Sequence, residues 1–491
     1  MIKSFIKSTG FIFLGNVLSK ILSLLTLSLI GRFLGPNILG SYNAVISTGT
    51  SINQILDFGS SIVIQKEAVN IEDKKNSYLI SLLTFYLSVQ FGVVLLLIVI
   101  SIFNADYILK LLFENEFSTQ ILYFLIPLVV LNLLIQMLQQ LLLGLGLFKE
   151  YASRIVIVNL ISFLTFIITF FIFGNSLYLS LVASIISLFF NVMITYFLIS
   201  KYVVNNEVGF SKLLLLDKTK STIYNGFIYY FGNTLVGAIV TLSLIGLFSN
   251  FISIKDFGYM RIGASLSAIL GVFIGSLQPV TIRLLSNSDF NANRLKSFQL
   301  RVVTCLLFIG VFFIVAFINP IISILFGDNY LEGKQIIVFM LLMQIIIFVS
   351  SLISNFQVAA NNTKFIGVIS AGGALLNLIL SFLLIPKYGI YGFYLSHFLG
   401  YIFGAIMLVY KEMTNNTYDD RQKIYLAFSF ILFGTFLLYL FDYIAYIYIQ
   451  IFAQILTLFF LVAIFYKFIL SEDERDISKK ILLNNFNRFL H

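Results

Sequence analysis

Residues 155–200 read IVIVNLISFLTFIITFFIFGNSLYLSLVASIISLFFNVMITYFLIS, a run of 46 residues without a charged side chain. Arg154 and Lys201 bound the run, and only the polar turn Gly174-Asn175-Ser176 interrupts it. About 20 apolar residues are enough for a helix to cross the hydrocarbon of a bilayer. The stretch therefore predicts two transmembrane helices back to back, at 155–173 and 177–200.

The remainder of the chain continues this pattern. Hydrophobic residues make up 59% of the 491 residues and charged residues 11%, whereas soluble domains are about one quarter charged. No polar stretch is long enough for a soluble domain. We therefore expect an all-α polytopic membrane protein of about 14 transmembrane helices. The expected helices are 8–33, 40–64, 78–103, 119–147, 155–173, 177–200, 223–249, 257–283, 302–326, 335–359, 365–386, 391–410, 424–441 and 444–467.

The distribution of positive charge predicts the orientation. With the N-terminus in the cytoplasm, 24 of the 31 Lys and Arg residues fall in cytoplasmic segments, 6 fall outside and Lys20 lies within a span. Cytoplasmic loops of membrane proteins carry such an excess. We therefore expect a multi-pass protein of the bacterial cytoplasmic membrane with both termini in the cytoplasm. The net charge of +9 is then mostly a topological signal, and nucleic acid is not an expected partner.

The two halves of the chain resemble each other at an offset of about 213–218 residues. Gly10-Phe11-Ile12 and Gly15-Asn16-Val17-Leu18 match residues 226–228 and 232–235, and Leu39-Gly40-Ser41-Tyr42 matches Phe257-Gly258-Tyr259. Because each unit contains six helices, both should have the same orientation and form two pseudo-symmetric lobes. Such internal repeats are common in alternating-access transporters. The predicted division is an N-terminal lobe at 1–200, a linker at 201–222, a C-terminal lobe at 223–410, two appended helices at 424–467 and a cytoplasmic tail at 468–491.

Four short motifs resemble a known family. They are Arg32-Phe33-Leu34-Gly35-Pro36 with Gly40-Ser41-Tyr42, then Asp57-Phe58-Gly59, Ile324-Leu325-Phe326-Gly327, and Ile385-Pro386-Lys387-Tyr388-Gly389-Ile390-Tyr391-Gly392. Over residues 8–410 the chain resembles the O-antigen and capsule repeat-unit flippases of the multidrug/oligosaccharidyl-lipid/polysaccharide exporter superfamily. The resemblance implies a V-shaped pair of six-helix lobes. It also implies transfer of undecaprenyl-diphosphate-linked oligosaccharides from the inner to the outer leaflet for surface polysaccharide assembly. Membrane lipids and the polymerase and export machinery are the partners that it implies.

Two charged residues within the expected spans are candidates for the substrate site. Lys20 lies near the middle of the first helix and Asp57 lies in the second. A charge at this depth is costly and usually faces a cavity or a partner of opposite charge. Lys20 and Asp57 could form a fixed ion pair, or Lys20 could face the central cavity and bind the lipid diphosphate.

Further polar residues extend this candidate site. Arg261 occupies the repeat position of Asn43 and could bind diphosphate or sugar acids, or lie at the membrane interface as an ordinary helix-end arginine. Asn16 and Asn233 are repeat equivalents that could bind sugar hydroxyls or serve close helix packing. Gln278, in the eighth helix, could bind sugar or form a hydrogen bond between helices.

Several classes of function are excluded because the sequence lacks the motifs that they require. It has no G-x-x-x-x-G-K-[ST] loop for an ATPase, no Cys/His cluster for a metal, and one cysteine, Cys305. We therefore expect no catalytic residues, metal or cofactor. A lipid II flippase and a drug/cation antiporter are the alternatives. A lipid II flippase should carry several arginines in its cavity, and a drug/cation antiporter should carry acidic residues there. A glycan polymerase would need a long outer loop, which the sequence lacks.

Overall fold

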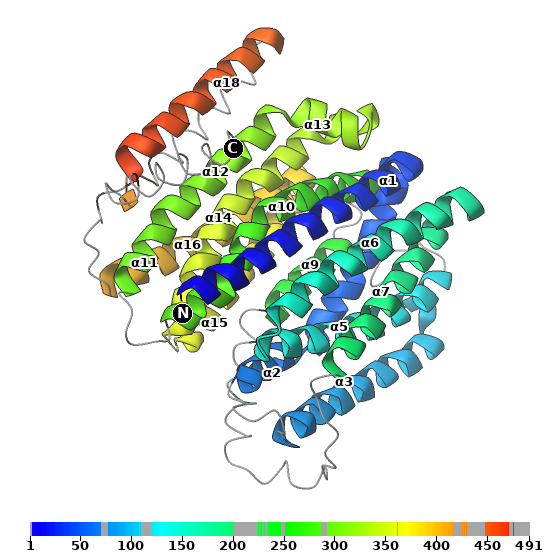
Figure 1. Cartoon of the computed structure of the whole chain (residues 1–491). Helices are drawn as coiled ribbons and strands as arrows, with labels where there is room; N and C mark the ends of the chain where they lie inside the picture. The colour runs from blue at the N-terminus through cyan, green and yellow to red at the C-terminus, as the bar shows by residue number, and fades with distance from the viewer. Residues whose placement is uncertain are drawn as a thin grey trace, which may run out of the picture.

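The chain folds into a bundle of long helices (Figure 1). The computed structural model describes residues 2–69, 77–107, 109, 119–200, 234–246, 251–285, 292–360, 362–415 and 447–470, together with residues 224, 226, 227, 230, 422, 424, 425, 427, 429 and 475. Every regular element in these ranges is a helix, which confirms the all-α prediction. Most of the linker at 201–222, the thirteenth expected helix at 424–441 and the tail at 468–491 lie outside the described residues.

Within the described residues, nine helices are long and apolar enough to cross a membrane. The first of these, Phe13–Leu56, belongs to α1 (Ile2–Leu56). At 1.5 Å per residue, the 55 residues of α1 correspond to about 80 Å, more than twice the hydrocarbon thickness of about 30 Å. The expected helices 8–33 and 40–64 are therefore joined in one element that is long enough for two crossings.

The chain reverses direction at Gly35 in the middle of α1. Gly35 has φ 74° and ψ 173°, a conformation outside the helix region. Pro36 follows as the first residue of the second segment, where its missing N–H costs no hydrogen bond. Phe33 and Tyr42 lie on either side of this turn. Both contact α6 (Phe148–Phe173), through Phe170 and Phe166 respectively.

The second crossing is interrupted once more, at Asp57-Phe58-Gly59. The residues Phe58 and Gly59 have φ angles of 48° and 79°, and a new helix, α2, covers Ser60–Val69. The sequence predicted one continuous helix at 40–64, and that prediction is wrong at this point. Positive φ angles cannot be accommodated in a right-handed helix, so the chain needs new hydrogen-bond partners here.

The remaining N-terminal helices follow the sequence prediction closely. They are α3 (Ser77–Phe103), α5 (Gln120–Gly144), α6 and α7 (Leu177–Ser200). The helix α6 begins seven residues before the expected start at 155, because Phe148 to Arg154 continue the helix beyond the uncharged run. The Arg154 side chain is buried there and donates hydrogen bonds to Thr195 and Gln139.

The C-terminal helices show one further difference from the prediction. The expected helix 302–326 starts ten residues early and consists of four segments: α11 (Ala292–Phe298), the π-helical η3 (Gln299–Val303), α12 (Thr304–Ala316) and α13 (Ile318–Leu325). The break at Phe317 places Pro320 in the first turn of α13, where proline is tolerated. The other helices are α9 (Val236–Gly246), α10 (Ile254–Leu285), α14 (Lys334–Ala359), α15 (Thr363–Tyr388), α16 (Ile390–Asn415) and α18 (Ile447–Ile464).

The last helix packs against α12 at one edge of the bundle (Figure 1). Its π-helical continuation, η5, covers Phe465–Ile469. The buried Arg301 donates a hydrogen bond of 2.6 Å from Nη1 to the carbonyl oxygen of Ile469. A buried guanidinium requires such partners. Arg301 therefore fixes the end of η5, the continuation of α18, on the C-terminal helices.

Candidate functional site at the seam between the two repeats

The N-terminal and C-terminal helices meet through a reciprocal pair of glycine contacts near Gly35. A Cβ atom on Gly40 would lie 1.8 Å from the carbonyl oxygen of Ile254, and one on Gly258 would lie 2.5 Å from that of Pro36. Gly40 and Gly258 are equivalent in the repeat at an offset of 218, and so are Pro36 and Ile254. Each repeat therefore presents the same patch to the other. The sequence identified Gly40 as part of a family motif and of the repeat, and the structure places it in this backbone contact.

Hydrogen bonds strengthen this contact, which we call the Gly35-end contact. Asn43 Nδ2 donates to the carbonyl oxygen of Phe257 at 3.0 Å, and Tyr330 Oη donates to that of Gly31 at 3.0 Å. Arg32 donates to the carbonyl oxygens of Leu325 and Ile324 at the end of α13. Cations are favourable at a helix C-terminus because the carbonyl groups there are unpaired. The charge distribution of the sequence predicts that this end of the bundle faces outward.

Lys20 and Arg261 belong to different repeats and lie within electrostatic range of each other. Lys20 is half-buried in the first half of α1, and Arg261 is half-buried in the second turn of α10. The two are close enough for their positive charges to repel each other. Within the described part of the chain, no carboxylate lies within ion-pair distance of either residue. Arg261 Nε is buried and has no hydrogen-bond partner there.

This arrangement has a chemical consequence. Two like charges held together at low dielectric are unfavourable unless an anion joins them. The guanidinium of arginine binds phosphate through two parallel hydrogen bonds, and lysine binds it as a point charge. Lys20 and Arg261 therefore have the chemistry of an anion-binding site. Each repeat supplies one of the two cations. Tyr42, whose hydroxyl pairs with Ser184 at 2.9 Å, also lies within the electrostatic range of Arg261.

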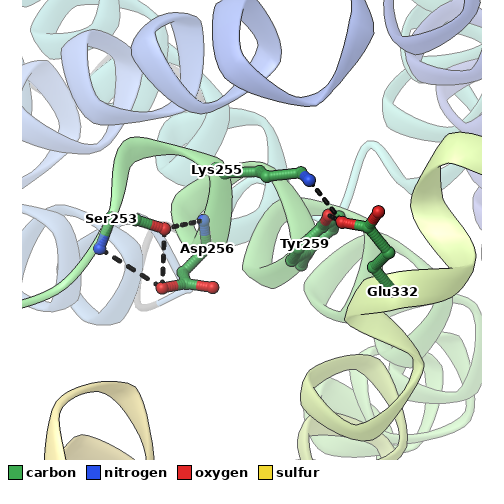
Figure 2. Close-up of polar contacts among 5 residues, drawn as sticks. All are labelled: Ser253, Lys255, Asp256, Tyr259 and Glu332. Atoms are coloured by element: carbon green, nitrogen blue, oxygen red, sulfur yellow. Dashed lines mark hydrogen bonds and ion pairs between the residues drawn. The ribbon is translucent and has the colours of Figure 1, made fainter.

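A polar cluster holds the first turns of α10, which carry Arg261 (Figure 2). Lys255 forms an ion pair with Glu332, and Tyr259 donates a hydrogen bond of 3.4 Å to the same carboxylate. The hydrogen bond from Lys255 holds the pKa of Glu332 below its usual range, and the same bond raises the pKa of Lys255. Both residues lie beyond the apolar parts of their helices, at the Gly35 end, and both are charged at neutral pH.

The same cluster contains a capping box at the start of α10. Ser253 donates from its backbone N–H and its hydroxyl to the carboxylate of Asp256, at 3.2 and 2.8 Å, and Asp256 N–H donates back to the Ser253 hydroxyl at 3.2 Å (Figure 2). Reciprocal bonds of this kind satisfy the free N–H groups of a helix start. These bonds fix the start of the helix that carries Arg261.

Among the described residues, no hydrogen bond or ion pair joins the other predicted site residues to Lys20 or Arg261. Asp57 is 6% exposed and bonds to serines of its own helix break, so the proposed Lys20–Asp57 ion pair is not formed. Asn43 is buried in the Gly35-end contact. Asn16 is half-buried in α1. Asn233 lies outside the described residues. Gln278 is in α10, but its side chain also lies outside the described part.

A second contact between the repeats, near Gly59, was not predicted from the sequence. A Cβ atom on Gly59 would lie 2.4 Å from the carbonyl oxygen of Gly226, and Tyr230 donates a hydrogen bond to the carbonyl oxygen of Ile55. The rings of Tyr230 and Phe58 are 6.0 Å apart. We call this the Gly59-end contact. The sequence pointed to this contact only through the glycine of Gly226-Phe227-Ile228. The repeat alignment matched that glycine to Gly10 and did not predict a contact from it.

Comparisons with known proteins identify the family. The model of a family described as polysaccharide biosynthesis protein matches residues 5–288, which is more than half of the chain. A search of curated proteins found no match.

Solved structures show the same fold. A lipid II flippase, MurJ, in an inward closed conformation matches with a TM-score of 0.70 and 17% identity, over 93% of this chain and 98% of that one. The MATE multidrug transporter DinF-BH matches with a TM-score of 0.59 and 13% identity, over 83% and 94%. An inward-facing MATE family transporter of the MOP superfamily matches with a TM-score of 0.60 and 11% identity, over 80% and 94%. The chain is therefore a membrane protein of the polysaccharide biosynthesis protein family, with a fold shared by flippases and multidrug transporters.

Proposed function

We propose that this protein is a flippase that moves undecaprenyl-diphosphate-linked oligosaccharide repeat units from the inner to the outer leaflet for surface polysaccharide assembly. The observation that carries the proposal is the pair of cations, Lys20 and Arg261, which come from different repeats and lie within electrostatic range of each other. No described carboxylate lies within ion-pair distance of either one, and Arg261 Nε has no hydrogen-bond partner among the described residues. A diphosphate is an anion of matching charge. The family and the flippase fold support the same reading.

The proposal includes the architecture expected from the sequence. The N-terminal lobe at 1–200 and the C-terminal lobe at 223–410 would move against each other, with the helices of 424–467 attached to the second lobe. The glycine contacts at the Gly35 end and the Gly59 end would open in turn, so that the substrate site faces one leaflet at a time. We place the protein in the bacterial cytoplasmic membrane with both termini in the cytoplasm. Asn16, Asn43, Asn233 and Gln278 stay candidates for contacts with sugar in other steps of this cycle.

A lipid II flippase is the second candidate, because the fold resembles MurJ and because lipid II also carries a diphosphate. The cation pair suits either lipid, so it does not separate the two. The drug/cation antiporter has less support. Its cationic substrate would be repelled by Lys20 and Arg261. The only acidic candidate that the sequence offered, Asp57, is buried and accepts hydrogen bonds from Ser60 and Ser61.

The experiment that tests the proposal is lipid extraction from cells that lack the gene, complemented with plasmid-borne variants. We expect an undecaprenyl-diphosphate oligosaccharide to accumulate without the protein and to disappear with the wild type. Lys20→Ala and Arg261→Ala should each lower transport roughly tenfold or more at unchanged protein level, because a hydrogen bond to a charged group contributes about 1.5–3 kcal/mol. Lys149→Ala, which removes an exposed cation of α6, is the control and should complement fully.

The other outcomes assign the function differently. Accumulation of lipid II instead of an oligosaccharide intermediate would establish the second candidate. Unchanged lipid intermediates with increased sensitivity to cationic dyes would establish the antiporter and overturn the proposal. Normal surface glycan in a well-expressed Lys20→Ala strain would remove Lys20 from the site.

A further inference from the structure

Asp57 is a buried carboxylate at a break in a membrane-spanning segment. It lies between the end of α1 and the start of α2, and 6% of its surface is exposed. In the described residues, no Lys or Arg lies within ion-pair distance of it. An uncompensated charge at this depth is costly and in membrane proteins usually marks a functional site.

The immediate partners of Asp57 are neutral. One carboxylate oxygen, Oδ1, accepts hydrogen bonds from the hydroxyl groups of Ser60 and Ser61, each at 2.7 Å, and from the Ser61 backbone N–H at 3.2 Å. These bonds resemble the capping of an ordinary helix start. They hold the carboxylate in place, but they supply no positive charge to balance it.

Two amide side chains in the hydrogen-bond network of this break each have an oxygen atom without a donor among the described residues. Gln90, from α3, donates from Nε2 to the Asp57 carbonyl oxygen at 3.3 Å and to Ser60 Oγ at 3.1 Å, which fixes its amide group at the break. The Oε1 atom of that amide is buried and has no hydrogen-bond partner among the described residues, and Gln90 is 1% exposed. A buried acceptor without a donor is unusual in a folded protein and requires an explanation.

A second unpartnered oxygen belongs to the same network. Asn53 lies one helical turn before Asp57 and is 7% exposed, and its Oδ1 atom also has no hydrogen-bond partner in the part of the chain that the structure describes. Its Nδ2 atom donates to Gln136 of α5 at 2.7 Å, and Gln136 donates in turn to Ser61 at 2.7 Å. Both amides therefore belong to the hydrogen-bond network of the serine-held carboxylate, and each has an acceptor oxygen without a partner in the described part of the chain.

We propose that this break binds a sodium ion, held by the carboxylate of Asp57 and by the side-chain oxygens of Gln90 and Asn53. Hard cations prefer carboxylate and carbonyl oxygens, and broken helices hold coupling ions in other transporters. One proton on Asp57 would neutralise the charge but could donate to only one of the two unpartnered amide oxygens. A metal ion can contact both, which favours sodium over a proton.

The proposed ion site lies next to the Gly59-end contact between the two repeats. Tyr230 of the C-terminal repeat donates to the carbonyl oxygen of Ile55 and packs on Phe58, and Gly59 lies directly against Gly226. An ion at the break therefore stiffens the segment that forms the Gly59-end contact. Coupling of the ion to transport rests on the proposed function, whereas binding of the ion does not.

The first test is equilibrium binding of radioactive sodium to the purified protein in detergent, with choline chloride as the background salt. We expect saturable binding of one ion per chain and a rise of the thermal unfolding midpoint in NaCl over KCl, because a ligand that binds only the folded state stabilises it. Asp57→Asn keeps an acceptor for Ser60 and Ser61 but removes the charge. It should fold in KCl and lose both sodium effects.

A matched control variant removes a capping carboxylate from a different helix start, that of α10. Asp256→Asn changes the carboxylate of the capping box of α10 (Figure 2), and it should bind sodium like the wild type. If Asp57→Asn does not fold, Gln90→Met supplies the test, since it removes Oε1 and leaves the carboxylate. It should weaken sodium binding about 10–100-fold, the usual effect of removing a group that supports a metal site.

Two results would overturn the proposal. One is the absence of saturable sodium binding to the wild type, which would leave Asp57 as a helix cap. The other is unchanged binding in Asp57→Asn or Gln90→Met, which would place the ion elsewhere. Because binding is measured without substrate, a failure here is distinct from the absence of lipid intermediates in the gene deletion, which would instead contradict the proposed function.

Discussion

The buried ion pair between Lys296 and Glu412 joins three C-terminal helices. Lys296 Nζ lies 3.0 Å from Glu412 Oε1, and their side chains are 11% and 0% exposed. Gln357 of α14 donates to the other carboxylate oxygen at 2.7 Å. Removal of one partner from a buried pair leaves an uncompensated charge and costs about 3–5 kcal/mol, whereas replacement of both can be nearly neutral.

We therefore expect Lys296→Met to lower the thermal unfolding midpoint of the protein in detergent far more than the double variant Lys296→Met/Glu412→Gln. The second substitution keeps an acceptor for Gln357 while removing the charge. The double-variant cycle measures the interaction directly. Strictly additive effects would show that the two charges do not stabilise each other.

Single residues also show what a sequence can and cannot predict. The repeat alignment placed Arg261 at the position of Asn43, and the structure shows both at the seam between the repeats. Their roles differ because Asn43 reaches the backbone of Phe257, while Arg261 Nε has no partner in the described residues. The Lys20–Asp57 ion pair was a reasonable inference from depth alone. It does not form, and Asp57 instead accepts hydrogen bonds from Ser60 and Ser61, three and four residues further along the chain.

The close approach of helices α1 and α10 depends on two glycines. Gly40→Ala would place a Cβ atom 1.8 Å from the Ile254 carbonyl oxygen, and Gly258→Ala would place one 2.5 Å from that of Pro36. Real Cβ atoms do not come this close to backbone, so the helices must separate. We expect either variant to weaken the Gly35-end contact.

The measurement is the labelling rate of a cysteine at Ala44, which is 3% exposed, by a membrane-impermeant maleimide. The reporter is Ala44→Cys in a Cys305→Ala background. Gly40→Ala and Gly258→Ala should raise the labelling rate severalfold. Gly92→Ala in α3, where a Cβ atom would meet nothing within 4 Å, is the control. Equal rates in all three variants would mean that the glycines do not keep the contact closed.

Helix positions were largely predictable from the sequence, and helix interruptions were not. Uncharged runs of about 20 residues predicted α3, α5, α7, α14, α15 and α16 to within a few residues, because the membrane fixes their length. The break at Asp57 was missed because apolar residues continue on both sides of it. The motif Asp57-Phe58-Gly59-Ser60-Ser61 does contain the required signals: a capping carboxylate, a glycine that tolerates positive φ, and two hydroxyl donors.

At the scale of the whole molecule, the described parts of the two repeats touch in two places, at the Gly35 end and at the Gly59 end. A carrier in this state must open one contact to load substrate and the other to release it. A covalent bond across the Gly59-end contact should therefore stop transport even though it touches no substrate residue.

The structure offers a matched pair of disulfides for this test. A Cβ atom on Gly226 would lie 3.8 Å from Val63 Cβ, and one on Gly49 would lie 3.8 Å from Leu128 Cβ; both distances fit a disulfide. Val63→Cys/Gly226→Cys joins the two repeats, whereas Gly49→Cys/Leu128→Cys joins α1 and α5 within one repeat. In a Cys305→Ala background, oxidation of the first pair should stop flipping and a reductant should restore it. The second pair should flip normally whether oxidised or reduced. Normal transport by the oxidised first pair would show that the repeats need not separate at Gly59, and substrate would then have to pass by a route that leaves this contact closed.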